Sequence, residues 1–162
     1  MLELKTPNNI KTLVPENLNE DNTQKFQSDN VNEIQEAKKF YDENGYVIIK
    51  KIISNEVCDT LRNFWTNEIK PFKGKIYRQT TSNAEVNVFN KNNWIMNPIL
   101  NIQSLNHKYF SGIRNCAEKN IFSSTKLCKI LNIFLNERPK FVQSMYFEGN
   151  SATWEHQDTY YL

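Results

Sequence analysis

The first regular pattern of apolar positions begins near residue 30 and predicts a helix followed at once by a strand. Apolar side chains recur at helical spacing from residue 31 to residue 41. Asn30, with Glu33 three residues later, fits a helix N-cap with a reciprocal acid. Gly45 supplies the stop, because glycine adopts positive φ at little cost. The β-branched, apolar run over residues 46–49 then predicts a strand.

A second amphipathic helix is predicted between Ser54 and Pro71. Ser54 is a favourable N-cap residue, and Glu56 lies where a carboxylate interacts favourably with the helix dipole. The apolar stripe of this helix indicates a face that packs into a core. It consists of Val57, Leu61, Phe64 and Trp65.

The middle of the chain carries weaker signals. Between residues 72 and 106 the sequence predicts only a short strand over 77–81 and a turn-rich segment over 89–94. Two helices are predicted after it, over 108–118 and 124–136, and the second has a clear apolar stripe after a Ser-Ser-Thr start.

Strands dominate the pattern only near the end of the chain. Residues 141–147 predict a strand, Gly149 breaks it, and a second strand is expected over 154–161. The order of helices and strands predicts an α+β fold in which the chain stops partway into a β-sandwich. We expect residues 1–28 to be a polar, mobile tail and residues 29–162 to belong to a single domain.

Composition and charge exclude some classes of protein. A net charge of +2 on 162 residues gives no strong electrostatic footprint for nucleic acid. The apolar runs are too short to span a bilayer, and the N-terminus lacks the apolar stretch of a signal peptide. Cys58, Cys116 and Cys128 have no paired spacing, which predicts reduced thiols, mostly in the core, and a cytoplasmic protein.

The candidate chemistry lies in the last predicted strand. Side chains alternate along a strand, so Trp154, His156 and Asp158 point the same way. One imidazole and one carboxylate thereby converge, as in two of the three ligands of a 2-His-1-carboxylate iron site. A histidine beside an aspartate is also common as a simple hydrogen-bonded pair, so the motif alone leaves both interpretations open.

Two separated parts of the chain resemble the phytanoyl-CoA dioxygenase family. Residues 40–49 and 53–58 resemble the family's opening, in which a helix ends in Gly-Tyr, a short strand follows, and a capped helix begins. Residues 143–147 and 154–161 look like its two strands around the iron. The resemblance spans about residues 31 to 162, and its two anchors occur in the family's order.

The resemblance implies an incomplete double-stranded β-helix, a cupin-like jelly-roll, preceded and flanked by several helices. It implies Fe(II), 2-oxoglutarate and O2 as cofactor and co-substrates, with His156 and Asp158 as the first two iron ligands. Gln143 would help to orient 2-oxoglutarate, or would be an interior amide satisfied by the backbone. Trp154 and Tyr161 would flank the metal and shape a substrate pocket, or would be core residues.

The reaction implied by the resemblance is hydroxylation of a small organic or acyl substrate, with release of succinate and CO2. Asp158 favours this outcome, since related halogenases carry a small residue in place of the carboxylate. The substrate itself and the oligomeric state are not indicated by the sequence, and fold alone does not fix them.

The family's second histidine and its 2-oxoglutarate-binding arginine follow the His-x-Asp strand. Nothing follows Leu162 here, and the only other histidine, His107, lies upstream in a polar stretch that predicts a surface position. We therefore expect the N-terminal portion of an oxygenase. The alternatives are a truncated, catalytically inactive jelly-roll that acts as a binding module, and an unrelated helical protein whose last strand is accidental.

Overall fold

The computed structural model describes residues 24–149, and these fall into two compact units that meet in sequence after Lys51. The predicted metal-binding strand over 154–161, and with it Trp154, His156, Asp158 and Tyr161, lies outside the described residues. The first unit is described from residue 24 to 51 and the second from 52 to 149.

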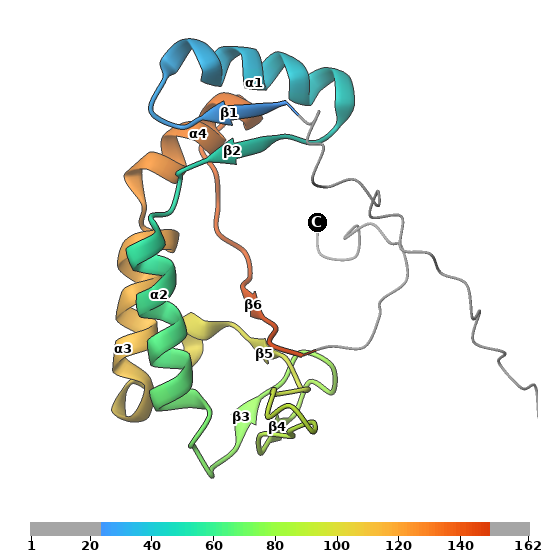
Figure 1. The fold of residues 1–162 in the computed structure, drawn as a ribbon, viewed down its shortest axis with the longest axis vertical. Coiled ribbons are helices and arrows are strands. Elements are labelled where there is room, and N and C mark those ends of the chain that lie inside the picture. The colour runs from blue at the N-terminus through green and yellow to red at the C-terminus, as the bar shows by residue number, and fades with distance from the viewer. Residues whose placement is uncertain (1–23, 150–162) are drawn as a thin grey trace, which may run out of the picture. The chain divides into compact units, whose positions relative to one another are not determined.

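The first unit is a helix with two short strands, drawn in blue and teal in Figure 1. It contains β1 (Lys25–Gln27), α1 (Val31–Asn44) and β2 (Ile48–Lys50), and β1 pairs with β2 in parallel, with Phe26 opposite Ile49. The helix predicted after Asn30 is confirmed. Two predictions are corrected: β1 falls inside the stretch predicted as a tail, and β2 begins two residues later than expected. Three-residue strands carry too little pattern to be recognised without their partner.

The predicted caps of α1 are present, with one difference. The Asn30 side chain accepts hydrogen bonds from the backbone N–H groups of Asn32 and Glu33, at 3.0 and 3.4 Å. The Glu33 carboxylate does not bond the backbone of Asn30; it accepts from the Asn30 side-chain amide (2.9 Å) and from the N–H of Gln27 (2.7 Å). The acid therefore links the helix to β1. Gly45 ends the helix at φ +76° and donates to the Tyr41 carbonyl at 2.8 Å.

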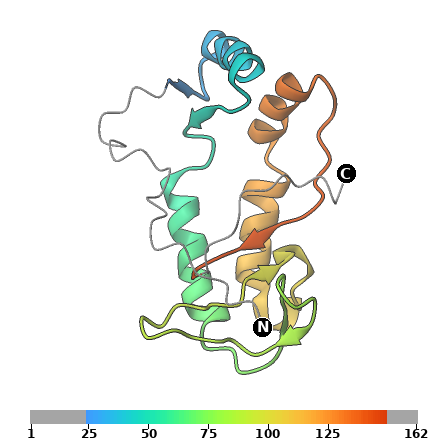
Figure 2. The same cartoon turned by 90° about the vertical axis from the view of Figure 1, so that its right-hand side faces the viewer.

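Helices form most of the regular structure of the second unit, and α2 and α3 lie side by side in it (Figures 1 and 2). Ser54 caps α2 as predicted, with its hydroxyl 3.3 Å from the N–H of Val57. The helices predicted over 108–118 and 124–136 are confirmed to within one residue. The helical segments are α2 (Asn55–Phe64), η1 (Trp65–Ile69), η2 (Ile102–Ser104), α3 (His107–Ala117), η3 (Glu118–Phe122) and α4 (Thr125–Leu135), of which η1 and η3 are π-helices and η2 is a 3-10 helix.

The strands of the second unit are two residues long and pair antiparallel. They are β3 (Ile76–Tyr77) with β4 (Ala84–Glu85), and β5 (Ile99–Leu100) with β6 (Met145–Tyr146). A bridge between Arg78 and Ile99 connects the two pairs. The strands predicted over 77–81 and 141–147 are thus shorter than expected. Of the first, only Tyr77 lies in a ladder, followed by Arg78 in an isolated bridge; of the second, only Met145 and Tyr146 do.

Mixed helices and short strands confirm the predicted α+β class. Across residues 24–149 the strands form three two-stranded sheets, with no closed barrel among them. The jelly-roll therefore stays a prediction. None of the helices in that range is long and apolar enough to cross a membrane.

The core of the second unit joins η1 and α3 to the segment from β3 to Leu105, with α2 packed against it, and α3 is kinked. Phe110 has non-helical dihedral angles (φ −132°, ψ 35°), which interrupts the helical hydrogen bonds. The Glu68 carboxylate of η1 replaces them by accepting from the N–H groups of Gly112 and Ile113, at 2.9 and 3.0 Å. Gly112 permits this approach, because a Cβ atom there would collide with the Phe64 ring and with Glu68.

Arg78 is the one charged side chain among the described residues that is fully buried. Its guanidinium donates to the Asn97 carbonyl (3.1 Å), the Glu85 carbonyl (3.3 Å) and the Asn87 side chain (2.6 Å). The pKa of this guanidinium lies below its ordinary value, because burial disfavours the charged form more than the nearby Glu85 carboxylate favours it. The Asn87 amide in turn donates to the Ile69 carbonyl at 2.7 Å, so the network connects the small sheets to the helical core.

Candidate functional site

Of the residues predicted to form the site, Gln143 alone lies in the described range, just before β6. It is half-buried, and within residues 24–149 its amide has no hydrogen-bonding partner. The interpretation of Gln143 as an interior amide satisfied by the backbone thus gains no support from the described residues. β6 is the last described strand before the His-x-Asp motif in the sequence, so its contacts show how the chain leading to that motif is held.

Ser144 begins the attachment of this segment to the second unit. Its carbonyl accepts from the N–H of Asn101 at 2.7 Å, and its own N–H donates to the Asn101 side chain at 3.2 Å. The Ser144 hydroxyl accepts from the N–H of Ile102 (3.2 Å) and donates to the Gln103 amide oxygen (2.8 Å). These bonds extend the β5–β6 pairing by one residue.

Tyr146 packs into the core two residues later. Its ring stacks on Trp65, with ring centroids 4.0 Å apart and planes inclined by 12°. Burial and the Glu148 carboxylate raise the pKa of the Tyr146 hydroxyl, and Arg62 opposes them. Trp65 is 3% exposed, and its indole N–H finds no acceptor within the described part of the chain. Leaving such a donor unpaired costs about 1–3 kcal/mol, so the stack forms despite that penalty.

Glu148 and Gly149 complete the attachment. The Glu148 carboxylate contacts the Lys70 ammonium at 2.6 Å and accepts from the N–H of Ile95 at 2.7 Å. Gly149 donates to the carbonyl of the same Ile95 at 3.0 Å, and a Cβ atom at Gly149 would lie 2.5 Å from the Met96 sulfur. The Glu148 side chain thus binds the N–H of Ile95, and the Gly149 backbone binds its carbonyl.

These contacts give the segment two different faces. Every second residue, Ser144, Tyr146 and Glu148, contacts other parts of the second unit. Met145 and Phe147 lie between them and are 43% and 44% exposed. Counted in steps of two, Gln143 falls into the same series as Met145 and Phe147; it precedes β6 and is half-buried.

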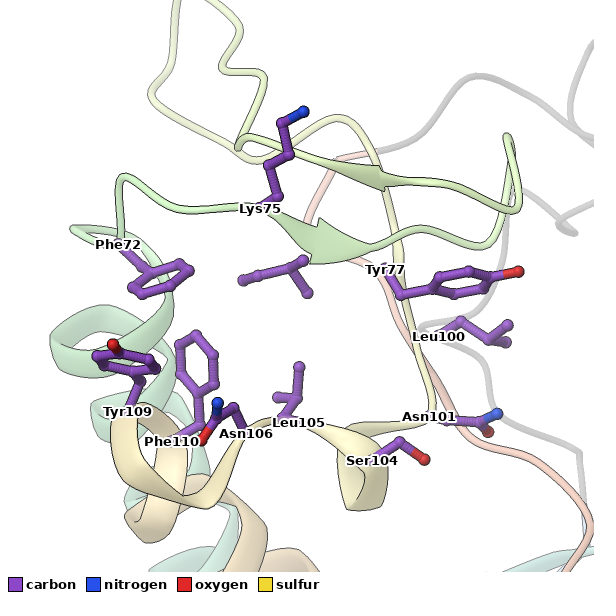
Figure 3. Close-up of a pocket in the computed structure, with 11 residues that line it drawn as sticks. Phe72, Lys75, Tyr77, Leu100, Asn101, Ser104, Leu105, Asn106, Tyr109 and Phe110 are labelled. Atoms are coloured by element: carbon purple, nitrogen blue, oxygen red, sulfur yellow. The ribbon is translucent and has the colours of Figure 1, made fainter.

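A separate cavity of about 220 Å³ lies between β3, η2 and the start of α3 (Figure 3). Phe72, Tyr109 and Phe110 gather at one end of it, and the Lys75 ammonium points away from it (Figure 3). The cavity is therefore lined by aromatic, aliphatic and small polar side chains, and its one charged lining residue among those described points outward. Gln143, which is the predicted site residue that the structure describes, does not line it.

Neither a histidine nor a cysteine completes a metal site in the described range. Between residues 24 and 149 no three His, Cys, Asp or Glu side chains group as metal ligands would. His107 is exposed at the first position of α3, as predicted. The three thiols are free, as predicted; Cys116 is buried, but Cys128 is exposed, so the expectation of a core position is wrong for it. It lies on the outward face of α4, whose buried side chains are Ile130 and Phe134.

Two features of this region were missed by the sequence patterns. Glu148 stands before a glycine in a turn, where a carboxylate is normally exposed, and its partners are distant in the sequence. Trp65 belongs to a predicted core stripe, but its stacking on Tyr146 depends on how the helices pack. The turn at Gly149 was the only local signal that the chain changes direction here.

Comparisons with known proteins found no matching family model, no matching curated protein and no matching solved structure. The resemblance of the sequence to the phytanoyl-CoA dioxygenase family therefore stays a prediction that rests on its motifs.

Proposed function

We propose that this chain carries the first metal-binding strand of an Fe(II)/2-oxoglutarate-dependent dioxygenase of the phytanoyl-CoA dioxygenase family. The enzyme hydroxylates a small organic or acyl substrate, and 2-oxoglutarate with O2 gives succinate and CO2. The domain is a double-stranded β-helix to which β6 contributes an inner strand. His156 and Asp158 hold the metal from the strand that follows β6.

The observation that carries this proposal is the alternation of contacts along residues 143–148, of which Met145 and Tyr146 form β6. The anchored face of this segment, at Ser144, Tyr146 and Glu148, fixes the strand on the second unit. Its open face presents Gln143, an amide without a partner among the described residues, next to two exposed apolar side chains. A strand that supports a buried co-substrate needs such a face, apolar but with a polar group that sets orientation.

The beginning of the chain supports the proposal independently. The family's opening consists of a helix that ends at Gly-Tyr, a short strand and a helix capped by serine. Here α1 ends at Gly45, β2 follows, and Ser54 caps α2. The two helix boundaries that carry the sequence resemblance thus form where their motifs imply, and the strand between them begins two residues later than predicted.

The donor atoms fit the metal. A neutral imidazole from His156 and a carboxylate from Asp158 are two of the three ligands that non-haem Fe(II) takes in oxygenases. With 2-oxoglutarate bound, such a centre supplies the activation of O2. The chain's own residues would orient the reactants: the Gln143 amide donates to a 2-oxoglutarate oxygen, and Trp154 and Tyr161 exclude water from the substrate side.

Anaerobic titration of the purified protein with Fe(II) and 2-oxoglutarate tests the proposal. The wild type is expected to develop the weak visible absorption of a 2-oxoglutarate chelate of ferrous iron. His156→Ala and Asp158→Ala each remove a ligand and should weaken iron binding by at least about tenfold. His107→Ala is the matched control, because it removes the other histidine, which is exposed on α3, and should bind as the wild type does.

Equal binding by the wild type, His156→Ala and Asp158→Ala would contradict the assignment of these residues. A wild-type protein that binds no iron would favour the alternative, a jelly-roll binding module without catalytic activity.

A further inference from the structure

Glu148 makes a pair of contacts that are unusual for a carboxylate in a turn. One oxygen contacts the Lys70 ammonium at 2.6 Å, and the other accepts from the N–H of Ile95 at 2.7 Å. The two side chains of the ion pair are only 19% and 21% exposed, so water screens the attraction less than it does on an open surface. Charge-assisted hydrogen bonds of this kind are among the strong ones in proteins.

The residue that Glu148 holds is itself rigidly placed. Ile95 is 1% exposed and pairs with Phe89 across a β-bridge. Its neighbour Met96 donates to the Val88 carbonyl at 2.8 Å. The clamp formed by Glu148, Gly149, Lys70 and Ile95 therefore attaches the chain to a part of the core that other contacts already fix.

Packing alone does not require a charged pair here. Withdrawing a carboxylate and an ammonium from water costs free energy, which an apolar pair of similar size would avoid. The charged pair adds directional contacts that an apolar pair would lack. The two Glu148 oxygens bind Lys70 and the Ile95 N–H, and with the Gly149 N–H they set both the position and the orientation of the chain. Metal ligands have to be held to within about 0.5 Å of a productive geometry, so direction matters for the segment that follows.

We propose that Glu148 is a positioning residue for the metal-binding segment, and that its clamp sets where the chain departs toward His156 and Asp158. This inference rests on the proposed function for its consequence at the metal, but the clamp itself can be tested without iron. Glu148 touches neither metal nor co-substrate in this proposal; it acts through the backbone that connects it to the ligands.

The first measurement is hydrogen exchange of the metal-free protein, read on peptides that cover residues 143–149 and Ile95. Glu148→Ala removes both contacts and should increase exchange there several-fold, while peptides from α2 and α3 stay unchanged. Lys70→Met removes the ion pair alone and should have a smaller effect, and Lys70→Arg, which restores a cation, should return exchange toward the wild type. Unchanged exchange in Glu148→Ala would overturn the clamp.

The second measurement is Fe(II) affinity in the presence of 2-oxoglutarate. Glu148→Ala is expected to weaken it by about tenfold, the lower end of what losing a supporting contact costs a metal site. Glu148→Gln keeps an acceptor for the Ile95 N–H and should lose less. The matched control is Glu68→Ala, which also removes a carboxylate bound to backbone N–H groups but lies in η1.

If Glu68→Ala weakens iron binding as much as Glu148→Ala at equal thermal stability, the positioning role is overturned and only a structural one remains. If the wild type binds no iron while Glu148→Ala still raises exchange, the proposed function fails and the clamp stands. A variant that does not fold is replaced by Glu148→Gln and Lys70→Met, which each leave one of the two contacts.

Discussion

Residues 24–51, in which two short strands pack with the helix α1, and residues 76–102, which are mostly short strands and turns, are held by side-chain contacts of different reach. In the first stretch the contacts join near neighbours: Glu33 reaches Gln27, and Lys38 pairs with Asp42 one turn later at 2.5 Å. In the second they join distant residues, as Arg78 does with Asn97 across 19 positions. Near neighbours can make their contacts early, whereas distant ones require the whole unit to be assembled.

The largest effect is expected from Arg78→Met, which removes the centre of the long-range network. Three acceptors, on Asn97, Glu85 and Asn87, would then be left without their donor in a buried site. The free energy of unfolding should fall by about 3 kcal/mol in urea denaturation.

Arg62→Met is the control for that change, because Arg62 pairs with Asp59 on an exposed face of α2. Its loss should be within about 0.5 kcal/mol. Similar losses for both arginines would break the distinction between the two kinds of contact.

Gly112→Ala should have the next largest effect, because a methyl group at this position collides with Phe64 and with the Glu68 carboxylate. Overpacking at a well-packed contact costs about 2 kcal/mol, which a thermal or urea melt would record. Ser111→Ala, one residue earlier in the same kinked helix, should be nearly neutral. A neutral Gly112→Ala would show that η1 and α3 are less tightly joined than the structure indicates.

Asn30→Ala tests the first stretch and should cost about 1 kcal/mol, the usual value for losing an N-cap. Because its contacts are local, the extra hydrogen exchange should be confined to α1 and the adjoining strand. Asn32→Ala, which alters a neighbouring exposed residue without removing the cap, serves as the control. Increased exchange throughout residues 52–149 would contradict the local reach of the contacts in residues 24–51.

The smallest effect is expected in alkali, at Tyr146. Its pKa in the folded protein is raised above the ordinary value of 10.0, so the unfolded chain loses this proton first as the pH rises. The associated stability is complete below pH 10.0 and is lost as the pH rises through the folded pKa. Tyr146→Phe should therefore show a shallower fall in urea midpoint above pH 10.0 than the wild type; parallel curves would contradict the raised pKa.

Local signals in the sequence explain which parts of the fold could be predicted. Asn30, Gly45 and Ser54 set helix boundaries through bonds to residues within four positions, and each was found from the sequence. The extents of β1 and β6 depend on which distant residues pair with them, so they could not be found from the local sequence. The burial of Arg78 was also hidden, since an isolated arginine in a polar stretch normally predicts an exposed position.

The candidate site divides in the same way. His156 and Asp158 follow from a spacing of two residues, and they stay predictions because they lie outside the described range. The anchoring of the segment before them, through Glu148 and Tyr146, depends on partners far away in the chain and became visible only in the folded structure.

The π-helix at Trp65–Ile69 has a consequence for how this helix could have been altered by insertion or deletion. A π turn holds one residue more than an α turn, and a single deletion within it would restore the ordinary helical repeat. The wide turn takes up its surplus residue locally, so removing that residue would leave the side chains before and after the turn in nearly their present directions around the helix axis. Trp65, which stacks on Tyr146, and Glu68, which is bonded to Gly112, both lie inside the turn. A deletion there would therefore disturb these two contacts and spare the face that α2 presents before them.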